Sequence, residues 1–158
     1  MGRSVLAGAP DRIERRSLVV MERRTVDDLA HIQAAWPAFE GLVGLRGRRM
    51  FAKVDVAPGT YSVCTPVRDD DPVDRFGLAL GTLAGGAYLR GHLAGEPPAL
   101  YERIAPGMRE LVAAAGDEVD ASRPLIEFYR RHDRIELWVP LRCVTDATGA
   151  DARPRRPR

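Results

Sequence analysis

The fold of this chain is decided by one stretch near its end, Arg123-Pro124-Leu125-Ile126-Glu127-Phe128-Tyr129-Arg130-Arg131, which continues as His132-Asp133 and Arg134-Ile135-Glu136-Leu137-Trp138-Val139-Pro140-Leu141. Two runs of strand-forming residues flank a short polar turn, which is typical of a β-hairpin. Successive side chains of a strand point to opposite faces. One face of the first strand therefore takes Ile126 and Phe128, and the other takes Leu125, Glu127 and Tyr129. The second face mixes a carboxylate with apolar and aromatic groups, and we expect the function there.

The first half of the chain carries a similar series of elements. Residues 50–56 and 60–67 flank Ala57-Pro58-Gly59, which predicts a second hairpin. A strand near 18–21 and an amphipathic helix over 28–43 precede it, with Asp27-Asp28 suited to the helix N-terminus. A strand over 86–89 and a helix that follows Pro97-Pro98 and ends at Gly116 precede the last hairpin. Strand, helix and hairpin thus occur twice, which indicates a duplicated unit.

The repeat predicts an α+β fold class: a duplicated β-α-β-β unit whose strands join in one antiparallel, curved sheet, with two helices on one face and a ligand cleft on the other. The two hairpins can be superposed with Lys53 on Glu127. The expected helix face takes Val54, Val56, Val63, Ile126, Phe128, Ile135, Leu137 and Val139. The expected cleft face takes Phe51, Lys53, Cys64, Glu127, Tyr129, Glu136 and Trp138.

The domain is expected to span residues 12–143, with repeats at about 13–67 and 76–142. Residues 1–11 are expected to form a flexible leader, and residues 144–158 a disordered basic tail. Four arginines and one aspartate lie in residues 151–158, so the net charge of +2 leaves the remainder near neutrality. We therefore expect no nucleic-acid surface on the folded domain.

Composition excludes several other classes of function. A hydrophobic content of 45% in 158 residues supports one globular domain. Cys64, Cys143 and the three histidines show no metal-ligand spacing, and we expect no metal and no cofactor. The first 16 residues lack the apolar core of a signal peptide, and no run is long enough to span a membrane, so a cytoplasmic protein is expected.

Several short motifs together resemble a known family. Gly85-Gly86-Ala87-Tyr88, Gly95 before a helix, Arg123-Pro124-Leu125-Ile126-Glu127-Phe128-Tyr129 and the closing Trp138-Val139-Pro140-Leu141 resemble the GyrI-like small-molecule-binding domain. This family includes the effector-binding domains of multidrug-responsive bacterial transcription regulators. The resemblance covers residues 17–142 and implies a duplicated β-α-β-β unit. It places Glu127 in an aromatic-lined pocket facing lipophilic, often cationic ligands, and Trp36 matches a tryptophan common in the family.

The resemblance and the strand pattern together give the candidate site. The ligand-binding candidates are Glu127, Tyr129, Trp138, Trp36, Phe51, Leu125 and Cys64. Trp36 also fits the apolar stripe of its helix, Cys64 is favoured as an inert small hydrophobe, and Lys53 as an exposed lysine. His132 is expected to be solvated in its turn.

Three functions remain open at this point. The first is a stand-alone protein, without the helix-turn-helix of the regulators, that binds or sequesters bulky lipophilic molecules, including cationic or genotoxic compounds. The second is a hydrolase that opens strained cyclopropane-type rings, in which the catalytic candidates are Glu127, Tyr61 and Tyr88 and Glu127 activates water. The third is a protein-interaction module of gyrase-inhibitor type. The oligomeric state is left open.

Overall fold

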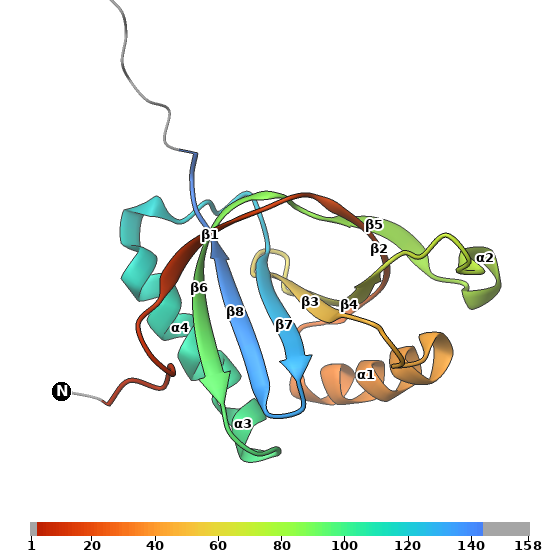
Figure 1. The fold of residues 1–158 in the computed structure, drawn as a ribbon, viewed down its shortest axis with the longest axis horizontal. Helices are drawn as coiled ribbons and strands as arrows, with labels where there is room; N and C mark the ends of the chain where they lie inside the picture. Colours follow the sequence, from red (N-terminus) through yellow and green to blue (C-terminus); the bar gives the residue numbers. More distant parts are fainter. Residues whose placement is uncertain (1–2, 144–158) are drawn as a thin grey trace, which may run out of the picture.

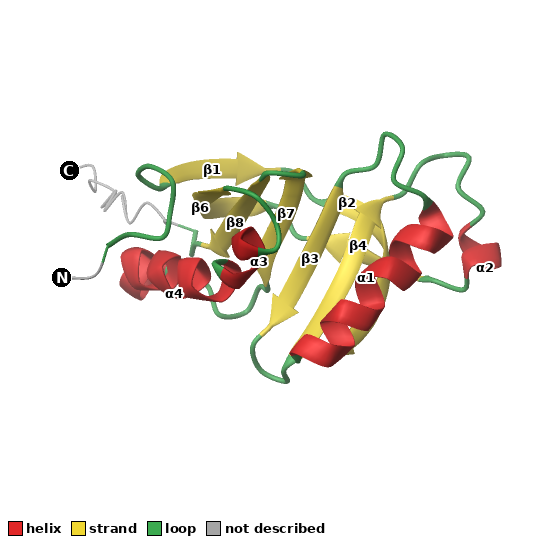
Figure 2. Cartoon of the chain, turned by 90° about the horizontal axis from the view of Figure 1, so that it is seen from below, coloured by secondary structure: helices red, strands yellow, loops and turns green. Residues whose placement is uncertain are grey.

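The structure, a computed structural model, describes residues 3–143, in which eight strands form one antiparallel sheet and the helices lie on one side of it (Figure 1, Figure 2). The predicted basic tail, 144–158, lies outside the described residues. The strands are β1 (Asp11–Arg15), β2 (Leu18–Val26), β3 (Met50–Asp55), β4 (Thr60–Pro66), β5 (Ala79–Leu83), β6 (Gly86–Ala94), β7 (Leu125–Arg131) and β8 (Arg134–Pro140). The helices are α1 (Leu29–Val43), α2 (Val73–Phe76), α3 (Ala99–Glu102) and α4 (Ile104–Ala115), with a 3₁₀ turn at Gly116–Glu118.

The duplicated unit is visible in the order of the strands, β1-β6-β8-β7-β3-β4-β2-β5. The unit β2-α1-β3-β4 mirrors β6-α3/α4-β7-β8 about the central pair of β3 and β7, where Ala52 lies opposite Glu127. The α+β fold class is therefore confirmed, including the antiparallel, curved sheet. No helix within residues 3–143 combines the length and apolar character needed to span a bilayer.

The helices begin and end where local chemistry predicts. The side chain of Asp28 caps α1 by accepting a hydrogen bond of 2.9 Å from the backbone N–H of His31, which satisfies one of the free amides of the first turn. Gly44, with φ of 77°, ends it. The second predicted helix is divided at Arg103 into α3 and α4.

An arch of two long strands joins the outer edges of the two units. β1 pairs with β6, and β2 pairs with β5, in one shared register that runs from Asp11 opposite Arg90 to Glu22 opposite Ala79. The ladder is interrupted at Gly85, where a Cβ atom would lie 2.6 Å from the backbone nitrogen of Ser17, so only glycine allows this close crossing. Figure 1 shows this arch above the central strands.

The predicted faces of β7 are wrong. Phe51 pairs with Cys64 in the first hairpin, and Ile126 pairs with Trp138 in the second, so the hairpins superpose Phe51 on Ile126 and Ala52, not Lys53, on Glu127. The β7–β8 ladder contains an irregularity between Phe128 and Arg131. One residue of slip moves every side chain of a strand to the other face. Glu127, Tyr129 and Leu125 therefore lie on the helix side, while Ile126 and Phe128 lie on the opposite, concave face.

Three clusters form the core. On the helix side, α4 covers a cluster with Leu93, Leu111 and Leu137, and α1 covers a cluster with Phe39 and Val63. The third cluster fills the concave face of the sheet and contains Val20, Phe51, Cys64, Leu83, Tyr88, Ile126 and Trp138.

The expected flexible leader instead contacts the domain. Leu6 is buried in the α4 cluster. The backbone N–H of Ala7 donates to the carbonyl of His92 at 2.7 Å, and that of Val5 donates to Glu110 on α4 at 2.9 Å. Asp11 already belongs to β1.

Candidate functional site

Glu127 lies at the centre of the molecule, on the strand where the two units meet. Only 6% of its surface is exposed, although a carboxylate is strongly hydrated in water. Its cross-strand neighbours are Ala52 on β3 and Leu137 on β8. Because neither neighbour is polar, the hydrogen bonds that offset this burial must come from other residues.

Two tyrosines supply them. Tyr61 on β4 and Tyr129 on β7 each donate a phenolic hydrogen bond of 2.7 Å to the same oxygen of Glu127, Oε1. Trp36 on α1 donates its indole N–H to the oxygen of Tyr61 at 3.1 Å. Within the described residues, the second carboxylate oxygen, Oε2, accepts no hydrogen bond. A recessed oxygen with free acceptor capacity therefore remains beside the aromatic rings.

The protonation of Glu127 follows from this environment. Burial raises the pKa of the carboxyl group above its ordinary value, and the hydrogen bonds from Tyr129 and Tyr61 oppose that rise because they favour the anion. Burial and the adjacent carboxylate raise the pKa of both phenols, so these remain protonated donors. A cation placed against Oε2 would lower the pKa of Glu127 again.

Aromatic rings surround this carboxylate on the helix side. The ring of Tyr129 packs edge-on against Trp36, with centroids 4.6 Å apart, and lies 6.5 Å from the ring of Tyr101 on α3. Tyr129 packs against both the α1 cluster and the α4 cluster, so it lies on the seam between the two units. Trp36 and Tyr129 are half-buried, and Tyr101 is 49% exposed. We call Glu127, Tyr61, Tyr129, Trp36 and Tyr101 the glutamate–aromatic cluster.

The other predicted site residues do not join this cluster. Trp138, Phe51 and Cys64 belong to the concave face, on the far side of the sheet from Glu127. Tyr88 also lies there and donates its hydroxyl to the carbonyl of Ala84, so the structure does not bring it beside Glu127. Leu125 lies on the helix side but packs against the α4 cluster. Cys64 is fully buried, and burial raises the pKa of its thiol to about 12, which makes it a poor nucleophile at neutral pH.

Lys53, which was expected to be an exposed lysine, also lies elsewhere. It is buried on the concave face and forms an ion pair with Glu22, not with Glu127. His132 is exposed in its turn, as expected. Glu136 was expected on the cleft face and is nearly inaccessible there: it accepts from the indole of Trp138 at 3.1 Å and pairs with Arg130 at 2.9 Å and Arg90 at 3.4 Å.

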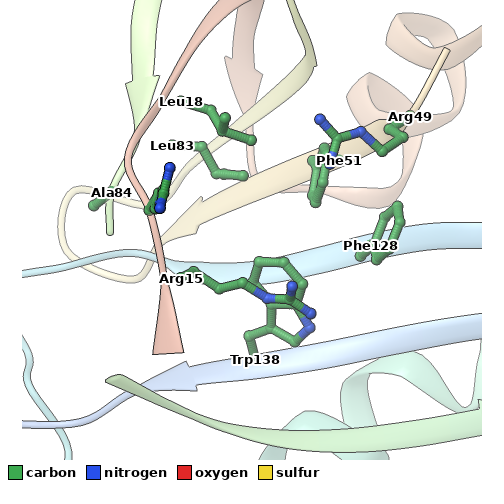
Figure 3. Close-up of a pocket in the computed structure, with 9 residues that line it drawn as sticks. Arg15, Leu18, Arg49, Phe51, Leu83, Ala84, Phe128 and Trp138 are labelled. Atoms are coloured by element: carbon green, nitrogen blue, oxygen red, sulfur yellow. The ribbon is translucent and has the colours of Figure 1, made fainter. Parts of the chain in front are cut away.

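The concave face has a pocket of its own. The rings of Phe51 and Phe128 stack with centroids 4.5 Å apart, and Trp138 packs edge-on against both. Figure 3 shows these rings with Arg15 and Arg49 beside them. This arginine-rimmed pocket has a volume of about 60 Å³ and is lined by Arg15, Arg16, Leu18, Arg49, Phe51, Leu83, Ala84, Phe128 and Trp138.

Sequence reasoning missed Tyr101, and it named Tyr61 beside Glu127 only as a catalytic candidate. Tyr101 fits the apolar spacing of its helix, and nothing local distinguishes it from a core residue. Tyr61 shares a sheet face with the helix-side residues Val54 and Val63, whereas Glu127 was predicted on the opposite face. No local sequence signal could have joined them, because the faces of both strands are set by the pairing of Ile126 with Trp138, which only the structure shows.

Comparisons with known proteins bear on the fold. No protein-family model matches the sequence, and no curated protein is significantly similar to it. An integron cassette protein from the mobile metagenome of Vibrio cholerae is 15% identical, with a TM-score of 0.66 over 84% of this chain and 95% of that one. SAV2435 bound to tetraphenylphosphonium is 17% identical, with a TM-score of 0.60 over 85% of this chain and 94% of that one.

The regulator EcmrR, solved in a complex with DNA, is 13% identical, with a TM-score of 0.64 over 86% of this chain and 58% of that one. These identities are low, so what the likeness establishes is the arrangement of strands and helices. The chain therefore shares its fold with these proteins, in agreement with the GyrI-like domain that its sequence resembles.

Proposed function

We propose that this domain binds bulky, lipophilic, cationic small molecules at the glutamate–aromatic cluster. The observation that carries the proposal is the buried carboxylate of Glu127, whose Oε1 holds two phenols while Oε2 accepts no hydrogen bond from the described residues. A soft organic cation matches an acceptor of this kind because it supplies charge without requiring a hydration shell. The tetraphenylphosphonium in SAV2435, which shares the fold, supports this class of ligand.

The rings of the cluster supply the second part of the affinity. Trp36, Tyr129 and Tyr101 present aromatic surface next to the carboxylate, and each cation–π contact is worth about 0.5–2 kcal/mol, depending on how far water is excluded. The partial exposure of these three rings makes them the groups that rotate aside when a ligand enters. The ligand then takes the place of Trp36 or Tyr129 over Glu127.

Calorimetric titration with tetraphenylphosphonium tests this proposal. We expect saturable binding that weakens by about tenfold or more in Glu127→Gln, since a charge-assisted contact is worth roughly 1.5–3 kcal/mol. Triphenylphosphine oxide, which is similar in shape but neutral, should bind the native protein and Glu127→Gln equally. The control Glu14→Gln removes an exposed carboxylate on β1 and should leave the affinity for tetraphenylphosphonium unchanged. Equal affinity of Glu127→Gln and native protein for the cation would refute the proposal.

The pH dependence has a definite sign. Only the ionised carboxylate attracts a cation, and burial raises the pKa of Glu127, so affinity should increase as pH rises through that pKa. The same experiment with Glu127→Gln should give an affinity independent of pH over that range.

A second candidate, hydrolysis of strained rings, is favoured by the closeness of Glu127 to the phenol of Tyr61. In this reaction a water oxygen bonds to one cyclopropane carbon, Glu127 takes the proton of that water, and the ring C–C bond breaks. The released carbon keeps the electron pair of that bond and is protonated by the phenol of Tyr61, which takes back the proton held by Glu127, so both groups return to their starting state. Incubation with a cyclopropane-bearing alkylating compound, followed by mass spectrometry, distinguishes the two functions. A ring-opened product that Glu127→Gln no longer forms indicates hydrolysis, and unchanged bound compound indicates sequestration.

A further inference from the structure

The arginine-rimmed pocket on the concave face combines an aromatic floor with positive charge. Arg15, Arg16 and Arg49 are exposed at its rim, and none of them pairs with a carboxylate in the part of the chain that the structure describes. Other arginines of the domain do form such pairs, for example Arg48 with Asp71 at 2.5 Å. The rim therefore carries uncompensated positive charge beside buried apolar rings.

We infer that this pocket is a second binding site, separate from the glutamate–aromatic cluster, and that it takes a planar aromatic anion such as an aromatic carboxylate. Phe128 lines the pocket while Glu127, the next residue, faces the helices, so the two sites lie back to back on β7. Guanidinium groups match carboxylates in geometry and charge, and ring faces match a flat apolar ligand. The ligand preferred here is thus opposite in charge to that of the first site.

Arg15 explains how a ring fits into so small a space. A volume of about 60 Å³ has room for the carboxylate group or a few waters and is small for a whole benzoate. The guanidinium of Arg15 lies 4.9 Å from the centroid of the Trp138 ring, over the surface on which a ligand ring would stack. Figure 3 shows this side chain extended over the indole. Because Arg15 is exposed, it can leave the indole to the ligand ring and bind the ligand's carboxylate instead.

The two tryptophans provide separate reporters of the two sites. Trp138 lines the arginine-rimmed pocket, and Trp36 belongs to the glutamate–aromatic cluster. The protein therefore gives two indole N–H signals in a ¹H–¹⁵N spectrum, which Trp36→Phe and Trp138→Phe assign. 4-Fluorobenzoate is then added to the native protein, and its neutral analogue 4-fluorobenzamide is added in a parallel titration.

We expect a saturable shift of the Trp138 signal with 4-fluorobenzoate, no shift of Trp36, and little response to 4-fluorobenzamide. Arg15→Gln and Arg49→Gln should each weaken binding about tenfold, as the loss of one charge-assisted contact implies. Arg109→Gln removes an exposed arginine from α4 and should leave the affinity unchanged. An unchanged Trp36 signal in the ligand-free variants shows that they remain folded, because Trp36 lies on the other side of the sheet from the substituted arginines.

Several results would overturn the inference: a shift of Trp36 instead of Trp138, no saturation at millimolar 4-fluorobenzoate, equal binding of 4-fluorobenzamide, or an equal loss in Arg109→Gln. Tetraphenylphosphonium added to the same sample should move the Trp36 signal. The two proposals can therefore fail independently of each other.

Discussion

Tyr61→Phe is the sharpest probe of the glutamate–aromatic cluster, because it removes one oxygen and keeps the ring. That oxygen donates to Glu127 at 2.7 Å and accepts from Trp36 at 3.1 Å. A hydrogen bond to a charged group is worth about 1.5–3 kcal/mol, and one between neutral groups about 0.5–1.5 kcal/mol. We therefore expect Tyr61→Phe to lower the free energy of unfolding by roughly 2–4 kcal/mol at a pH that ionises Glu127.

The loss should also depend on pH. The phenol favours the carboxylate anion, so Tyr61→Phe raises the pKa of Glu127 further above its ordinary value. A carboxyl group whose pKa is raised in the folded state gives its stabilisation at low pH and loses it as pH rises through the folded pKa. The difference between native protein and Tyr61→Phe should therefore be smaller at pH 5 than at pH 8.

Urea unfolding followed by far-UV circular dichroism measures both effects without relying on Trp36 emission. The matched control is Tyr88→Phe, whose hydroxyl donates to the carbonyl of Ala84 on the concave face, away from Glu127. The loss in free energy of unfolding that Tyr88→Phe causes should be the same at pH 5 and pH 8. The reasoning fails if Tyr61→Phe costs less than about 0.5 kcal/mol, the size of an ordinary surface substitution, or if its cost is as independent of pH as that of the control.

Three further predictions concern other buried groups. Lys53→Met should destabilise the fold by about 3–5 kcal/mol because it leaves Glu22 buried without its partner, and the double variant with Glu22→Leu should recover most of the loss in urea unfolding. The hydrogen bonds from Arg48 lower the pKa of Asp71 from 3.8 to about 2, so the stability this carboxylate contributes is present above about pH 4 and is lost as pH falls through 2. Asp71→Asn should lack that part of the acid dependence in melting temperatures measured between pH 5 and pH 2. Iodoacetamide at pH 8 should add one group to the native protein, at exposed Cys143, and a second group only in urea, since Cys64 is buried and its thiol has a pKa of about 12. Intact mass measures the additions, and two additions to the native protein would contradict this prediction.

Local chemistry was sufficient to predict most elements of the fold. The helix over 28–43 has a carboxylate cap and regular apolar spacing, and it appears as α1 with almost the predicted bounds. Both hairpins are marked by turn residues between β-forming runs and appear as β3–β4 and β7–β8. The duplication was visible because the same order of elements returns, although few residues are identical.

The faces of β7 could not be predicted, because this strand is buried on both sides. Ile126 is buried among aromatic rings and Glu127 is buried under the helices, so the usual assignment of apolar residues to the helix side gave the wrong answer. The one-residue offset between the hairpins depends on how β7 pairs with β8, which no local signal reports. Glu127 was predicted as the central residue, with Tyr129 and Tyr61 among the candidates, but Tyr101 was not, because it comes from another element.

The crossing of β1–β2 with β5–β6 has a consequence for how the protein unfolds. Each repeat extends one strand onto the rim of the other: β1 completes the second repeat and β5 completes the first. If one repeat unfolded alone, the repeat that stays folded would lose a neighbouring strand. The backbone amides and carbonyls of its edge would then be exposed. Despite its two helix-covered cores, the domain should therefore lose its structure in a single cooperative step, and two separately expressed fragments should fold only when mixed.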